Sequence, residues 1–166
     1  MGEQQDVRTA DGEADERPMG GYAMAMAGYA TYAAGWTALI QRYGRPPERH
    51  DALDIVLAAI ATFRISRLLT KGAVTSPLRT PFTTYEGPQG PAEVSERPRH
   101  GLRHTVGELL TCPFCMSLWV STTLTAGRCL WPRATRAATA VMASVAGADA
   151  LQLAYSGLME KVTRSQ

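Results

Sequence analysis

Two long stretches without a charged residue constrain this chain more than any other feature of its sequence. Residues 18–41 form an uncharged run of 24 residues, and residues 109–127 form one of 19. A helix of about 20 apolar residues crosses a bilayer, so both runs are long enough to do so. The first run is rich in Ala, Gly and Tyr, which favours close helix packing through Ala23, Ala27, Gly28 and Gly35. The second is the better candidate for a membrane span.

The composition offers little material for a water-soluble core. Ala accounts for 25 of the 166 residues, whereas Leu, Ile, Val and Phe together account for 31. The formal net charge is only +2, so the chain is not of the strongly charged kind that stays unfolded. Basic residues are scattered rather than clustered on one segment, which argues against a nucleic-acid partner.

Charge divides the chain into a tail and one domain. Residues 1–17 hold six acidic and two basic residues and almost nothing that could be buried, which predicts a disordered acidic tail. The tail lacks the basic start and the continuous apolar run of a secretory signal. Residues 18–166 are expected to form a single helical domain.

Periodicity and turn signals predict four helices in that domain, near residues 20–43, 51–71, 104–131 and 134–161. Along the second helix, one face begins apolar and ends with Arg64, Arg67 and Lys71, as in a helix that leaves hydrocarbon for lipid headgroups. Five prolines in residues 72–104 predict an ordered or semi-ordered connection instead of a helix. The predicted fold class is therefore an all-α bundle of about four helices, packed through small residues and embedded in a membrane.

One carboxylate interrupts the last predicted helix. Asp149 is the single charged residue in the sequence between positions 137 and 159. A lone carboxylate in hydrocarbon needs a partner, and Arg64 or Arg67 of the second helix is the natural candidate. Arg67 has a second option, which is to bind a lipid phosphate. In a soluble bundle, Asp149 would simply mark the solvent-facing side of its helix.

Cys112 and Cys115 are the residues with reaction chemistry of their own. They form Cys-Pro-Phe-Cys, with Thr111 placed to cap a helix and Pro113 in its first turn. A helix N-terminus stabilises a thiolate, which is the basis of dithiol redox sites. Glutaredoxins use the same tetrapeptide, but the strand that precedes it in their fold is not indicated here. Three roles stay open: a structural pair packed as small apolar side chains, redox exchange, or metal binding.

Zinc is the metal that this sequence suggests. His100, His104, Cys112 and Cys115 follow the spacing His-x3-His-x7-Cys-x2-Cys, and two His with two Cys suit tetrahedral zinc. This is not the spacing of a standard zinc finger. Cys129 would lie about 21 Å from Cys115 along a continuous helix, so it is not expected to join them. Residues 72–104 hold no glycine-rich phosphate loop and no nucleophile elbow, which gives a hydrolase little support. We do not expect a resident cofactor other than zinc, and an enzyme is not favoured.

Two sequence blocks resemble a known family. They are ATFRISRLLTKGAVTSPLRTPF, residues 61–82, and ELLTCPFCMSLWV, residues 108–120. Together they are similar to a bacterial and phage family known as domain of unknown function 1360, over roughly residues 51–131. The resemblance implies a small multi-pass membrane protein without an established activity, one branch of the family being associated with sporulation. It supplies no catalytic residue.

The predicted function is that of a small multi-pass integral protein of the cell membrane with a structural or assembly role. Its expected partners are the lipid bilayer and either another protein or a second copy of the chain. Two alternatives remain: a membrane thiol–disulfide or metal-binding protein that uses the Cys-Pro-Phe-Cys pair, and a soluble helical protein that binds a partner through its basic faces. Neither a substrate nor a membrane topology follows from the sequence.

Overall fold

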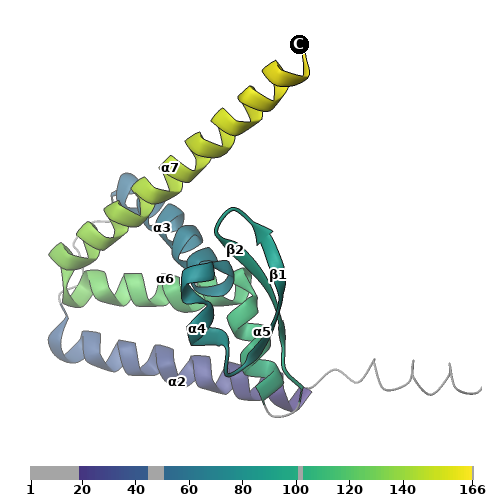
Figure 1. Ribbon diagram of the computed structural model, residues 1–166. Helices are drawn as coiled ribbons and strands as arrows, with labels where there is room; N and C mark the ends of the chain where they lie inside the picture. The colour runs from purple at the N-terminus through teal and green to yellow at the C-terminus, as the bar shows by residue number, and fades with distance from the viewer. Residues whose placement is uncertain (1–18, 45–50, 101–102, 166) are drawn as a thin grey trace, which may run out of the picture.

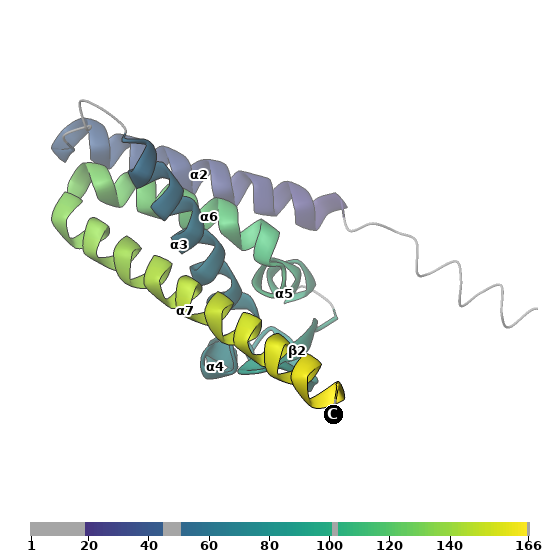
Figure 2. The same cartoon turned by 90° about the horizontal axis from the view of Figure 1, so that it is seen from above.

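The computed structural model describes residues 19–44, 51–100 and 103–165, and the predicted acidic tail at 1–17 lies outside them. Five helices form the body of the molecule (Figure 1): α2 (Met19–Tyr43), α3 (Ala52–Lys71), α5 (His104–Thr111), α6 (Pro113–Leu130) and α7 (Pro132–Arg164). Helix α3 packs against α6 and α7, and α2 packs against α6. Figure 2 shows α3 running obliquely across α6, and Figure 1 shows the C-terminal half of α7 projecting away from the other helices.

A β-hairpin occupies most of the predicted connection between the second and third helices. Helix α3 leads into η1 (Ala73–Thr75) and α4 (Ser76–Arg79), and then into β1 (Thr83–Gly90) and β2 (Glu93–Pro98). The two strands pair antiparallel with two register shifts. The mostly helical fold is confirmed, but the prediction of an all-α fold missed this small two-stranded sheet. Glycines and prolines within the strands hide the period-two alternation by which a strand is recognised.

The predicted third helix is two helices in the structure. Helices α5 and α6 meet at Cys112 with a bend of 77°. Cys112 has an extended backbone, with φ −99° and ψ 106°. Proline at position 113 explains this break, because proline disfavours a helical conformation of the preceding residue and cannot donate the hydrogen bond that would continue α5. The other three predicted helices are confirmed, although α7 begins and ends a few residues outside the predicted range.

Helix α2 packs against α6 through aromatic side chains instead of the small residues that the sequence suggested. A Cβ atom added at Gly28 or Gly35 would meet nothing within 4 Å, so neither glycine mediates a close contact. Tyr29 and Tyr32 lie against Trp119 of α6. Their ring centroids are 5.4 Å and 4.9 Å, respectively, from that of Trp119. Small residues do bring helices together elsewhere, because a Cβ atom at Gly127 would lie 2.7 Å from Thr135 Oγ1.

The distribution of apolar side chains is inverted relative to that of a water-soluble protein. Within the described ranges, the buried apolar residues are Ala61, Val120 and Ala126. Seven buried residues are polar or charged: Ser66, Thr70, Arg79, Thr83, Glu96, Thr135 and Thr139. Large apolar side chains are exposed on four helices, among them Met24, Met26, Ile55, Phe63, Phe114, Leu151, Leu153 and Leu158. The helices therefore leave many large apolar side chains exposed, and the residues that they bury completely are mostly small or polar.

Candidate functional site

The most deeply buried charged group is Arg79, at the end of α4. Its side chain is 1% exposed and pairs with Glu96 of β2, with Nη2 3.0 Å from Oε1 and Nε 3.0 Å from Oε2. Arg79 Nη1 donates to Leu69 O and to Thr75 Oγ1, both at 2.7 Å. Nη2 also donates to Gly72 O at 3.0 Å. All five N–H groups of the guanidinium therefore have an acceptor.

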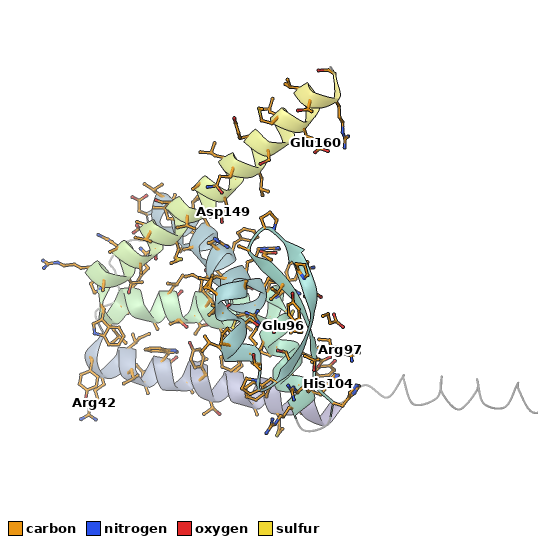
Figure 3. All side chains as sticks on the ribbon, viewed as in Figure 1. Arg42, Glu96, Arg97, His104, Asp149 and Glu160 are labelled. Carbon is orange, nitrogen blue, oxygen red and sulfur yellow. The ribbon has the colours of Figure 1, made fainter. Side chains whose placement is uncertain are left out.

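The Glu96 carboxylate is equally well satisfied. Besides Arg79, it accepts hydrogen bonds from Ser76 Oγ at 2.6 Å and Thr83 Oγ1 at 2.7 Å. Figure 3 marks Glu96, a buried residue of β2. Because no donor or acceptor of the pair is left free for a ligand, this cluster fastens the hairpin to the C-terminal end of α3. Sequence reasoning missed the pair, since charged residues 17 positions apart in a proline-rich segment look like surface residues.

The Glu96 carboxyl group should make stability depend on pH. Burial raises the pKa of Glu96, whereas hydrogen bonds from Arg79 and two hydroxyl groups lower it. The lowering effects together are larger than the effect of burial, so the pKa lies below its ordinary value. A carboxyl with a depressed folded-state pKa adds stability above its unfolded pKa of about 4.3 and loses it as pH falls through the lower folded value. Thermal unfolding midpoints from pH 7 to pH 3 should fall less steeply for Glu96→Gln than for the wild type. Glu86→Gln, at an exposed position, is the matched control, and equal slopes for Glu96→Gln and the wild type would contradict this assignment.

The structure brings Arg64 and Asp149 together. Arg64 Nε on α3 lies 2.7 Å from Asp149 Oδ2 on α7. Asp149 is labelled in Figure 3. Arg64 Nε lacks an aligned hydrogen-bond acceptor, so the contact is an ion pair without good hydrogen-bond geometry. Arg67 does not join them: it forms a two-point pair with Glu93 of β2, its Nε 3.0 Å from Oε1. A third pair, Arg128 with Asp54, ties the end of α6 to the start of α3.

The two cysteines lie at the bend between α5 and α6. Cys112 is the N-cap of α6, and its Sγ accepts a hydrogen bond from the Cys115 N–H at 3.2 Å. The predicted cap, Thr111, instead ends α5, where its Oγ1 donates to Gly107 O at 3.0 Å. The prediction was one residue early because the break at Pro113 leaves Cys112, and not Thr111, as the last extended residue. Both thiols are free, with Cys112 half-buried and Cys115 exposed.

The predicted zinc ligands do not form a metal site in this structure. In the part of the chain that the structure describes, no group of three or more His, Cys, Asp or Glu side chains lies close enough to hold a metal ion. The His100 and His104 rings are 6.5 Å apart. His104 Nδ1 lies 3.7 Å from Glu108 Oε2 on its own helix. The described donors therefore do not fit a tetrahedral zinc site.

A groove of about 810 Å³ runs between α3 and α6. Its walls are mainly apolar and include Ile55, Phe63, Leu118 and Leu124. One end is lined by Ser66, Arg67, Pro113 and Phe114, and the other by Arg128 and Cys129. Pro113 and Phe114 are the two residues between the cysteines, but neither Cys112 nor Cys115 lines the groove. Sequence analysis gave no sign of the groove, which depends on how two helices cross.

A comparison with family models shows which family the chain resembles. The model of a protein family of unknown function, DUF1360, matches residues 57–155. The chain belongs to the DUF1360 family. The match confirms the resemblance seen in the two sequence blocks and extends it into α7, so that it includes the Arg64–Asp149 pair, the Arg79–Glu96 cluster and both cysteines of the bend. Neither the curated proteins nor the solved structures include a significant match.

Proposed function

We propose that this DUF1360 protein is a small multi-pass integral protein of the cell membrane with a structural or assembly role. The observation that carries the proposal is the inverted distribution of apolar side chains. Three apolar residues are buried in the described chain, while large apolar side chains on α2, α3, α6 and α7 face outward. Each Å² of apolar surface left in water forgoes about 25 cal/mol, so exposure on four helices favours a lipid environment.

Helix lengths support this arrangement. By length and hydropathy, α7 could cross a membrane on its own, and the bent pair of α5 and α6 could serve as a second span. Helix α6 has 18 residues, or about 27 Å at 1.5 Å per residue, close to the thickness of the hydrocarbon core. Helix α2 has 25 residues, but it is not among the helices that are both long and apolar enough to span a membrane. In the proposed membrane, Arg64 would give Asp149 the partner that a carboxylate on α7 requires.

Polar features at the two ends of the bundle are consistent with two water-facing surfaces. The hairpin and its buried ion pair lie at one end, beside α5 (Figure 1). At the other end, where α6 meets α7, Arg128, Arg133 and Arg136 lie close in sequence to Trp131. Arginine and tryptophan are side chains that favour the headgroup region. The bundle between these two ends would span the hydrocarbon.

The second half of α7 supports a role in assembly. All side chains from residue 150 to residue 165 are exposed. Leu151, Leu153 and Leu158 are each more than 60% exposed. A helical segment of this length that is covered by no other described residue is available for lipid, for another membrane protein or for a second copy. Those are the partners that the proposal assigns to it.

Membrane fractionation tests this proposal. We expect the protein to stay in the membrane pellet after extraction with alkaline carbonate and to be released by detergent. A peripheral membrane protein in the same sample is the control, since it should leave the pellet in carbonate. Release of the protein by carbonate alone would contradict integral insertion and would favour the soluble alternative.

A substitution on α7 gives an independent readout of the same proposal. Leu151 is 73% exposed, so in water Leu151→Arg should change stability by less than about 0.5 kcal/mol. Near the middle of a membrane span, the same arginine costs about 2.5–3.5 kcal/mol and should reduce the inserted fraction. Thr163→Arg, near the end of α7, is the matched control. Equal insertion of the two variants would argue against a spanning α7.

A further inference from the structure

We propose that the groove between α3 and α6 is a binding site for one anionic phospholipid. Arg128 and Arg136 hold the lipid phosphate at one end, and an acyl chain lies along the apolar wall. This site deepens the proposed function and rests on it, because the lipid enters the groove from the bilayer. Two independent observations carry it: the two ends of the groove differ in charge, and the wall between them is apolar and open at the side.

The end of the groove near the junction of α6 and α7 has an excess of positive charge. Arg128 lines this end, and its Nη2 lies 2.5 Å from Asp54 Oδ2. Arg136 Nη2 lies 3.8 Å from the same oxygen, so two guanidinium groups share one carboxylate. Arg133, in the first turn of α7, and Asp51, the N-cap of α3, offset each other. Three arginines against two aspartates leave a net charge of +1, which complements the single negative charge of a phosphodiester.

These arginines also have donors left for a phosphate. Asp54 uses Nη2 of Arg128, whereas Nε and Nη1 have no hydrogen-bond partner among the residues of known position. The Arg136 side chain is 67% exposed, and its contact with Asp54 is too long for a hydrogen bond. Guanidinium groups bind phosphate oxygens through two parallel N–H donors. Arg128 and Arg136 can therefore hold a phosphate without giving up Asp54.

The opposite end of the groove is electrically neutral. Arg67 lines it, and Nε and Nη2 of this residue donate to both carboxylate oxygens of Glu93. The nearby hydroxyls of Ser66 and Ser117 donate to carbonyls of their own helices. A groove with one cationic end and one neutral end favours a ligand with an anionic head and an apolar tail, and it fixes which way that ligand points.

The wall between the two ends suits an acyl chain. Ile55, Phe63 and Leu118 line it, and each is half or more exposed, so the groove opens sideways toward the proposed lipid. The volume of about 810 Å³ lies within the range of about 300–1,000 Å³ that ligand sites have. The hydrocarbon of one leaflet is about 15 Å thick, half of the bilayer core, so a chain that starts at Arg128 reaches roughly to Leu118 along α6.

Charge also argues against a second copy of the chain as the occupant. The segment that a second copy could insert is the exposed part of α7, from residue 150 onward. Residues 150–165 carry Lys161 and Arg164 against Glu160, which is a net charge of +1. This segment does not complement a cationic end, whereas an anionic lipid does.

Native mass spectrometry of the purified full-length protein in detergent tests the headgroup end. The probes are dioleoylphosphatidylglycerol, which is anionic, and dioleoylphosphatidylcholine, which has the same chains and a choline group. One equivalent of phosphatidylglycerol should bind about tenfold more tightly, because choline brings a positive charge to a cationic end. Arg136→Gln should remove most of this preference, whereas Arg97→Gln on the hairpin should retain it. Equal wild-type affinities for the two lipids, or a dimer without bound lipid, would overturn the proposal.

A bulky side chain in the groove tests the acyl-chain part of the site. Ser121 lines the groove between Leu118 and Arg128, so Ser121→Trp should weaken phosphatidylglycerol binding several-fold. Leu153→Trp, at an exposed position of α7, is the matched control and should leave binding unchanged. Unchanged affinity in both Ser121→Trp and Arg136→Gln would overturn binding in the groove.

Photolabelling of the wild type decides the question if a variant fails to fold. Phosphatidylglycerol with a diazirine in its acyl chain should label peptides of α3 and α6, and labelling confined to α2 and α7 would overturn the proposal. Lipid binding in detergent and carbonate extraction of membranes are separate measurements. Resistance to carbonate together with equal affinities for the two lipids would overturn this site and leave the proposed function intact. Release by carbonate would overturn the proposed function, whatever the two affinities are.

Discussion

Replacing Arg79 with methionine should destabilise the protein by about 3–5 kcal/mol, because it leaves a buried carboxylate without its partner. Glu96 is buried with Arg79 and accepts two of its hydrogen bonds. The substitution also leaves Leu69 O and Gly72 O without the donors that Arg79 supplies. Urea or thermal unfolding, monitored by circular dichroism in detergent, measures the loss of free energy of unfolding.

An exposed ion pair on the same hairpin provides the control. Arg97 Nε lies 3.8 Å from Glu86 Oε1, and both side chains are largely exposed. Arg97→Met should cost less than about 1 kcal/mol, since exposed pairs contribute little. The double variant Arg79→Met with Glu96→Leu should lose less stability than Arg79→Met alone, because it removes the unpaired charge as well. Similar losses for Arg79→Met and Arg97→Met would show that the buried cluster does not hold the hairpin in place.

Arg64 and Asp149 should be energetically coupled. Arg64→Gln and Asp149→Asn should each lower stability by about 2–3 kcal/mol if the pair lies within the membrane, where an unpaired charge is costly. The double variant should lose clearly less than the two single losses together, because it leaves no charge without a partner. Thermal unfolding of the four proteins in detergent or lipid nanodiscs gives the coupling energy.

The last turn of α7 supplies the matched control for this cycle. Arg164 pairs with Glu160 one turn away, and both side chains are exposed. Such i,i+4 pairs contribute about 0.2–0.5 kcal/mol. Coupling between Arg64 and Asp149 should exceed this value several-fold. Strictly additive losses in the Arg64 and Asp149 variants would show that the contact between α3 and α7 does not stabilise the bundle.

The long helices could be predicted because their signals are local. Helix α3 begins where Asp51 accepts a hydrogen bond from Leu53 N at 3.2 Å, as a capping residue does. The spacing of apolar residues and the positions of prolines indicate where most of the other long helices begin or end. The bend at Cys112 could also have been found, because Pro113 signals it. The hairpin could not, since its pairing joins β1 to β2 across glycines and prolines that resemble a loop.

One of the ion pairs could be predicted from the positions of charged residues in the sequence, and two could not. A lone carboxylate in an apolar helix calls for a basic partner, and the structure brings Asp149 to Arg64. The same reasoning could not find the partner of Arg67, because Glu93 lies in the hairpin that was not predicted. For the same reason, it could not find the Arg79–Glu96 cluster. The groove between α3 and α6 depends on the angle at which two helices cross, which no local pattern records.

The five hydrogen bonds of Arg79 also have a consequence for the axial position of α3. Two of them end on the carbonyls of Leu69 and Gly72, in the final turn of that helix and just beyond it. A slide of α3 by one turn, about 5.4 Å, would also break its ion pairs at Asp54, Arg64 and Arg67. Here any such shift would pull the carbonyls away from a guanidinium that the hairpin holds through Glu96. In the proposed membrane, the hairpin therefore acts as a stop that fixes the depth of α3, and with it the level at which Arg64 meets Asp149.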